Sequence, residues 1–147
     1  TLLISQFRTD KSSVEVSIGT VRINPNFAYA YYNRGIVRSK LEDKQGAIED
    51  YTQAINIDPN FADAYHNRGI VRSKLEDKQG AIDDYTQAIR INPNCANAYF
   101  NRGLVRSKLG DKQGEIKDIQ IAANIYKKEG KETDYQKAME KIKNMSK

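Results

Sequence analysis

Residues 27–60 read FAYAYYNRGIVRSKLEDKQGAIEDYTQAINIDPN, and residues 61–94 read FADAYHNRGIVRSKLEDKQGAIDDYTQAIRINPN. These two consecutive stretches of 34 residues differ at five positions, which are 29, 32, 49, 56 and 58 in the numbering of the first. Identity at this level indicates a recent internal duplication, and a fixed period of this length is typical of repeat architectures. The repeat therefore decides the fold class.

The same period extends beyond these two units. The chain of 147 residues has three prolines, at positions 25, 59 and 93, and each stands in the phrase Ile-Asn-Pro-Asn or Ile-Asp-Pro-Asn. A third copy, residues 95–128, follows the pattern closely up to Gly114 and then diverges. We therefore expect repeats at 27–60, 61–94 and 95–128, a degenerate half-repeat at 1–26 and a capping helix at 131–147.

Each unit carries two helical patterns. In the first unit, one helix is expected from about Phe27 to Leu41, after Asn26 as the N-cap. Asp43 can cap a second helix, which Pro59 ends because a proline biases the preceding residue away from helical angles. The second helix has apolar residues at the spacing of one buried face: Ala47, Ile48, Tyr51, Ala54 and Ile55. Two short helices cannot bury such faces alone, so the units must stack as an all-α solenoid.

The unit resembles the tetratricopeptide repeat, a family whose 34-residue repeat is an antiparallel helix pair. The resemblance rests on spaced aromatic, small and apolar residues and on the proline. In the first unit these are Tyr31, Gly35, Leu41, Ala47, Tyr51, Ala54 and Pro59. It implies a right-handed superhelical solenoid of antiparallel helix pairs with a C-terminal capping helix. Such arrays act as binding scaffolds, so we expect a protein that binds another protein and is not an enzyme.

Two arginines in each unit depart from the family pattern, which has a leucine and an aromatic residue at these places. In the first unit they are Arg34 and Arg38, one turn apart on the face that bears Tyr31. Partial burial is expected there, and a buried arginine requires a carboxylate, for which Asp50 on the second helix is the natural candidate. The same pairing would recur as Arg68 with Asp84 and Arg102 with Asp118. Contact with a ligand is the alternative, and Arg38 could also reach Glu42 at i+4.

The two ends of the chain carry different patterns. Residues 133–136 have the spacing of a capping box and are expected to open a final helix. Its apolar face should hold Tyr135, Ala138, Met139, Ile142 and Met145. Residues 1–26 are expected to be mostly helical, although Val14, Val16 and Ile18 alternate as they would in a strand. If that segment fails to cover the first repeat, a second copy of the chain could pack there as a homo-oligomer.

The composition argues against several classes of function. The single His66 and the single Cys95 allow neither a two-histidine zinc motif nor a CxxC pair, so we expect no catalytic residues, no metal and no cofactor. No apolar run approaches the roughly 18 residues that span a bilayer, so no membrane association is expected. One cysteine, and no apolar run long enough for a signal peptide, favour a cytoplasmic location.

The resemblance also implies which surface binds a partner. In this family the first helices line a concave groove, which would here carry four rows with one residue from each repeat. The rows are Tyr32, His66 and Phe100; Asn33, Asn67 and Asn101; Ile36, Ile70 and Leu104; and Lys40, Lys74 and Lys108. Equivalent residues of adjacent repeats would lie about 10 Å apart, one helix-packing distance. This is close to three residues of an extended peptide, so the asparagine row could bond a partner's backbone.

The charge pattern indicates the kind of partner. The first helices are basic and the second helices acidic, in a chain of net charge +5, so we expect an extended or helical protein segment of acidic character. Some relatives grip the C-terminal carboxylate of chaperones, but only Asn67 fits among the equivalent positions, which hold Tyr32, Ile36, Asn67, Asn97 and Asn101. RNA or another polyanion is an alternative, disfavoured because few aromatic residues could stack on bases. A purely architectural segment of a longer array is a third.

Overall fold

The computed structural model describes residues 25–145, which fold into helices joined by short turns, with no strand in that range. The helices are α2 (Pro25–Lys40), α3 (Lys44–Ile57), α4 (Ala62–Lys74), α5 (Lys78–Ile91), α6 (Ala96–Lys108), α7 (Lys112–Lys128) and α8 (Glu132–Met145). The predicted all-α architecture is confirmed. The half-repeat expected at residues 1–26 lies almost entirely outside the described residues.

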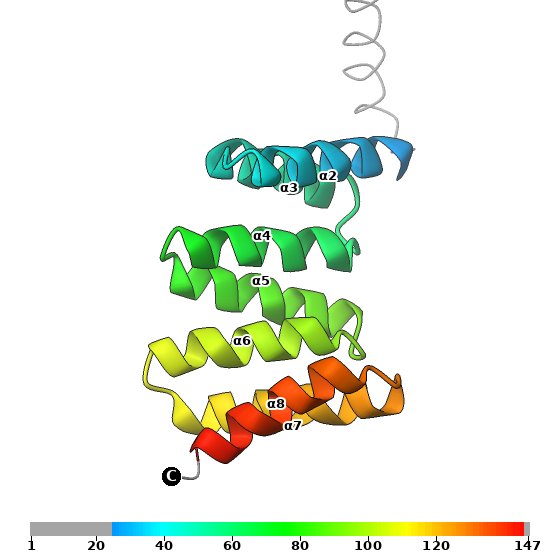
Figure 1. The fold of residues 1–147 in the computed structure, drawn as a ribbon. Coiled ribbons are helices and arrows are strands. Elements are labelled where there is room, and N and C mark those ends of the chain that lie inside the picture. Colours follow the sequence, from blue (N-terminus) through cyan, green and yellow to red (C-terminus); the bar gives the residue numbers. More distant parts are fainter. Residues whose placement is uncertain (1–24, 146–147) are drawn as a thin grey trace, which may run out of the picture.

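The helices form a stack in chain order, with α2 and α3 at one end and α7 and α8 at the other (Figure 1). Each helix packs against the next one along the chain, and the first helices α2, α4 and α6 also touch their counterparts in adjacent pairs. Each helix pair therefore packs against the preceding helix pair in the chain. This is the stacking that two-helix units need in order to bury their apolar faces.

The turns between the two helices of a unit repeat the same geometry. Asp43, Asp77 and Asp111 each accept a hydrogen bond from a backbone amide three residues later, as expected for the first of them. The residue two positions after the first helix has a positive φ of 62° at both Glu42 and Glu76, and its counterpart Gly110 has a φ of 80°. Glycine adopts this conformation without steric cost, so the third repeat has the least strained of these turns.

The helix ends near the prolines follow the sequence only in part. Asp58 is extended and ends α3 at Ile57, as Pro59 predicts. Asn26 does not cap the first helix, because α2 already begins at Pro25. The capping box is also wrong: α8 begins at Glu132, so residue 133 lies inside the helix, and Gln136 Nε2 donates to Glu132 Oε1 at 2.6 Å.

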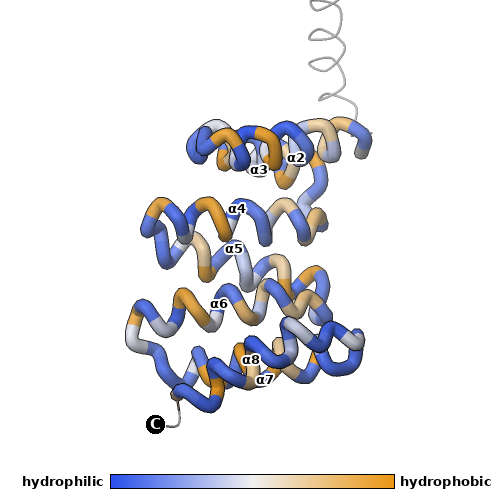
Figure 2. Tube along the Cα trace, in the orientation of Figure 1, coloured by the Kyte–Doolittle hydropathy of each residue, from blue (hydrophilic) through white to orange (hydrophobic). Residues whose placement is uncertain are grey.

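Small residues let the helices of a pair approach closely. A methyl group on Gly35 would lie 2.7 Å from Tyr51 Cε1, and one on Gly69 would lie 2.8 Å from the same atom of Tyr85. Both tyrosine rings are buried, and Ala47 and Ala81 are fully buried beside them. The rings therefore fill the space that the glycines leave, as close packing requires. Figure 2 shows the result, in which each helix carries both hydrophobic and hydrophilic residues.

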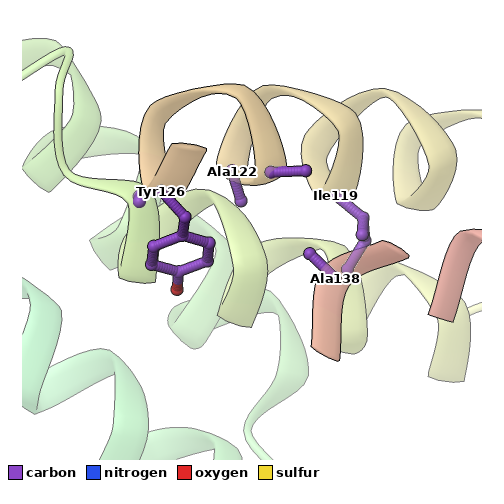
Figure 3. Packing of buried hydrophobic residues seen from close by; sticks show 6 residues of the cluster. Ile119, Ala122, Tyr126 and Ala138 are labelled. Carbon is purple, nitrogen blue, oxygen red and sulfur yellow. The ribbon is translucent and has the colours of Figure 1, made fainter. Parts of the chain in front are cut away.

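The last helix closes one end of the stack. Ile119, Ala122 and Tyr126 of α7 and Ala138 of α8 belong to one buried cluster (Figure 3). Tyr135, Ile142 and Met145 pack against this cluster, as the apolar pattern of α8 predicts. Met139 is exposed, which corrects its assignment to the buried face.

An ion pair joins α7 to α8 within this interface. Glu115 stands where the first two repeats have alanine, and its side chain is only 2% exposed. Lys141 Nζ lies 3.2 Å from Glu115 Oε1, although the geometry is not that of a hydrogen bond. Charge attraction from Lys141 therefore stabilises this buried carboxylate.

Candidate functional site

The surface made by α2, α4 and α6 bears two shallow hollows that repeat the same chemistry. The first is lined by Ile36, Ser39, Lys40, Tyr51, Asn67 and Ile70. The second is lined by Ile70, Ser73, Lys74, Tyr85, Asn101, Leu104, Val105 and Lys108. Each hollow combines apolar, hydroxyl, amide and ammonium groups at the 34-residue offset of the repeat. We call this surface the first-helix face.

Eight of the twelve residues predicted for the groove line one of these hollows. Ile70 belongs to both, which places the two hollows side by side. The other four are absent from the two linings: Tyr32, Asn33, His66 and Phe100. Asn33 is exposed, whereas the three ring-bearing residues are half-buried between helices.

The asparagine row is partly occupied by contacts within the chain. Asn67 Nδ2 donates to the Tyr32 hydroxyl at 3.1 Å. Asn101 Nδ2 lies 3.1 Å from His66 Nε2, so the same cross-repeat link recurs with a different ring. These amides therefore join adjacent repeats, and a partner would have to bond to the carbonyl oxygens or displace the rings.

Burial controls the ionisation of His66. The pKa of this imidazole is lowered chiefly by burial, against an opposing effect of the nearby Asp63 carboxylate. Its ring also packs against Tyr85, with ring centroids 5.8 Å apart. A neutral ring can accept the Asn101 amide proton at Nε2, whereas an imidazolium cannot.

This gives a first prediction on stability against pH. The unfolded chain, in which the pKa of His66 is ordinary, takes up the proton first as the pH falls, so the folded state loses stability below about pH 6.5. We expect His66→Phe, which reproduces Phe100 of the third repeat, to lose less stability than the parent protein as the pH falls from about 7 to about 5. Urea unfolding of both proteins across this range measures it. Parallel curves for the two proteins would contradict the assignment.

The exposed positive charge of the first-helix face comes from its lysines. Lys40 and Lys74 are exposed, and neither forms a hydrogen bond or ion pair in the described part of the chain. Lys108 Nζ lies 4.0 Å from Glu76 Oε1, at the limit of an ion pair between exposed groups. Ammonium groups of this kind can attract an acidic ligand without first breaking a strong internal contact.

The arginines serve the structure instead. Arg68 Nε and Nη2 donate to the two oxygens of Asp84 at 2.9 and 2.7 Å, and Arg72 Nη1 reaches the same carboxylate at 3.0 Å. Arg102 and Arg106 repeat this arrangement on Asp118. The predicted pairing of arginine with aspartate is confirmed in all three repeats, since Arg34 also holds Asp50 bidentately.

One expected ion pair does not form. Arg38 contacts Asp50, Asp43 and the carbonyl of Gly46 instead of Glu42. Glu42 lies in the left-handed turn and pairs with Lys44, so its carboxylate leaves the helical i+4 position. Arg106 still pairs with Asp111 and Asp118, so Gly110 in the third repeat costs neither of these ion pairs.

Sequence reasoning missed several lining residues, of which Ser39, Ser73, Tyr51 and Tyr85 repeat in the two hollows. A signal was present for the serines, because each lies one turn after an isoleucine of the groove rows. The tyrosines come from the second helices, and the pattern alone assigns them wholly to the core.

Two further observations limit the chemistry of the described residues. Within residues 25–145, histidine, cysteine and acidic side chains form no group that could hold a metal ion. Among the described helices, none has the length and apolar character needed to cross a membrane.

Residues 28–61 and 62–95 match the family model of the tetratricopeptide repeat. The chain contains tetratricopeptide repeats. The α6–α7 pair follows the two matched repeats with the same arginine–aspartate network and the same turn. No curated protein sequence matches the chain significantly.

Several solved structures share this architecture. MamA is 30% identical to this chain and superposes with a TM-score of 0.69. The match covers 74% of this chain and 63% of the MamA chain, so this chain spans less than two thirds of MamA. The second repeat domain of Spaghetti (RPAP3), bound to the HSP90 peptide SRMEEVD, is 28% identical with a TM-score of 0.68, over 69% of this chain and 94% of that one. The TPR2B domain of yeast Sti1, in a pHsp70 complex, is 21% identical with a TM-score of 0.76 over 81% and 95% of the two chains, which shows a shared fold.

Proposed function

We propose that this protein is a cytoplasmic, non-enzymatic scaffold that binds an acidic peptide segment of a partner protein on its first-helix face. The observation that carries the proposal is the pair of adjacent hollows with the same lining. Each offers an aliphatic floor, an amide and a lysine ammonium group, supplied by neighbouring repeats. An extended segment crossing both would meet the same set of groups twice.

The spacing of the hollows favours an extended ligand. Equivalent groups in adjacent repeats are about 10 Å apart, so a peptide that advances about 3.3 Å per residue can place every third side chain in a hollow. The ligand class is therefore a segment with acidic residues near Lys40 and Lys74 and aliphatic residues over Ile36 and Ile70. Lysine contacts at the edge of the surface would mainly speed association and set specificity.

The peptide-bound relatives support the binding of an acidic peptide by this protein, but they do not indicate that it binds the same peptide as they do. The peptide SRMEEVD bound by the Spaghetti domain carries three carboxylate side chains, an acidic character that also suits this surface. Of the positions at which some relatives grip chaperone tails, only Asn67 carries the required residue type, and its amide already bonds to Tyr32. We therefore expect internal acidic segments to bind better than SRMEEVD.

Peptide binding by lysine variants tests the proposal. Fluorescence anisotropy with a labelled pool of short acidic peptides should show binding, and Lys74→Ala should weaken it about tenfold, or about 1.4 kcal/mol. Lys117→Ala is the matched control, because Lys117 is an exposed lysine of α7 outside both hollows. The control should bind as the parent protein does.

The competing ligand class gives a different result. If single-stranded RNA binds more tightly than every acidic peptide, with an affinity that falls steeply with salt, the surface serves nucleic acid and the proposal fails. Equal affinities of the Lys74 and Lys117 variants would likewise remove the first-helix face as the site.

A further inference from the structure

The helix α2 exposes a face that its two counterparts bury. Val37 is 54% exposed, whereas the equivalent Val71 and Val105 are 1% and 2% exposed. Ala30 is also exposed, although its counterparts in α4 and α6 are fully buried. This face, defined by Phe27, Ala30, Arg34 and Val37, lies at the end of the stack (Figure 1). We call it the uncovered face of α2.

The arginine at the centre of this face lacks a contact that the others make. The side chain of Arg34 is 56% exposed, whereas those of Arg68 and Arg102 are 12% and 11% exposed. Arg68 Nη1 donates to Thr52 and Arg102 Nη1 donates to Thr86, each on the second helix of the preceding repeat. The uncovered face is therefore shaped to receive a second helix of the same kind.

The contacts of α3 with α4 show what such a covering helix must supply. Val71 lies in a buried cluster with Ala47 and Tyr51, and Ile48 packs against it. Ala64 lies in a cluster with Ala54 and Ile55. The covering helix thus needs a small residue at two places and an aliphatic residue directly after each.

Residues 10–23 stand 34 positions before α3 and meet these needs by their sequence. The places of Ile48, Thr52 and Ile55 are taken by Val14, Ile18 and Val21, which have the i, i+4, i+7 spacing of one helical face. The places of Ala47 and Ala54 are taken by the small residues Ser13 and Thr20.

The differences between residues 10–23 and α3 point the same way. Asp50 binds the arginines of its own first helix, and Tyr51 packs on Gly35 of that helix. Valine and serine stand at these two places, residues 16 and 17, so residues 10–23 lack the side chains with which α3 holds α2. What residues 10–23 share with α3 are the small and aliphatic positions at which α3 packs on α4.

A second copy of the chain fits this face less well. Residues 25–40 include no aspartate or glutamate, so two copies of α2 packed by this face would bring Arg34 near its own counterpart with no carboxylate of the other α2 to pair with it. Stacking of one chain on the end of another is also blocked, because α8 already covers α7.

We propose that residues 10–23 of the same chain cover the uncovered face of α2 as a second helix, in the register that α3 takes on α4. The proposal does not depend on the peptide site, because the covering residues lie at the end of the stack and line neither hollow. Protection of Val37 would come mainly from Val14 and Ser13, by equivalence with the cluster around Val71.

Thiol labelling of the full chain tests this proposal. Val37→Cys is introduced in a Cys95→Ser background and its reaction with a maleimide is timed. We expect Val14→Asp to speed labelling roughly tenfold or more, because a buried charge opens the contact locally. Val16→Asp is the matched control, since position 16 faces away from α2 in the proposed register, and it should leave the rate unchanged. Hydrogen exchange of α2 amides in chains that keep Val37 should show the same contrast.

Three results would overturn the proposal. The first is a thiol at position 37 that reacts as fast with Val14 in place as it does in the Val14→Asp variant. The second is an equal effect of Val14→Asp and Val16→Asp, which would exclude the register. The third is protection that grows with protein concentration, which would assign the face to a second copy.

Discussion

Replacing Asp84 with alanine is expected to lower the free energy of unfolding by about 3–5 kcal/mol. The carboxylate is buried and accepts hydrogen bonds from both Arg68 and Arg72. Its removal leaves two guanidinium groups partly buried without their counter-charge, and Arg68 would also hold Thr52 less firmly. Urea denaturation of the two proteins measures the difference.

The neighbouring residue provides the control. Asp83 is exposed on the same helix, so Asp83→Ala should change stability by no more than about 0.5 kcal/mol. Asp50→Ala should cost less than Asp84→Ala, because half of the Arg34 side chain is already in water. A loss at Asp84 no greater than that at Asp83 would show that the arginines do not depend on this carboxylate.

Replacing Lys141 with methionine is the change with the second largest expected effect. It keeps most of the apolar side chain but leaves the buried Glu115 without its cation. We expect a loss of about 2–3 kcal/mol, less than for a fully buried pair because the Lys141 side chain is 37% exposed. The loss should appear in the unfolding free energy and as faster hydrogen exchange in α8.

A double variant separates the ion pair from general packing. Glu115→Leu with Lys141→Met would replace the ion pair by an apolar pair of similar volume. We expect this protein to be as stable as the parent, because a buried ion pair and a well-packed apolar pair of similar volume often contribute equally. If the double variant were less stable than Lys141→Met, attraction between Glu115 and Lys141 would not be what holds α8 in place.

The repeat period made much of the fold predictable. Thirty-four residues with one proline and two apolar stripes predict two helices and a stacked neighbour, and the helices lie where the stripes do. The arginine–aspartate pairs were also predictable, because Arg34 must be partly buried if Tyr31 on the same face is. These inferences use features that recur in each unit, so each inference can be checked against the sequences of all three repeats.

The remaining details depend on local angles and on contacts between units, which a pattern does not contain. Glu42 was expected to pair with Arg38, but its left-handed backbone turns the carboxylate toward Lys44. The asparagines were expected to be free for a ligand, yet Asn67 and Asn101 bond to rings of the repeat before. Ser39 and Ser73 of the hollows were not predicted, although each lies one turn after an isoleucine of the groove rows.

The matching interfaces between α3 and α4 and between α5 and α6 have a consequence for how this kind of array can change in length. Arg68 bonds to Thr52 as Arg102 bonds to Thr86. One more copy of the 34-residue unit could therefore be inserted between two repeats, and every interface between adjacent repeats would keep this hydrogen bond. Growth beyond α7 is blocked, since Glu115 and α8 close that end of the stack. Lengthening by insertion would add a third hollow beside the existing two, so a longer ligand could be accommodated by a single unequal crossover in the gene.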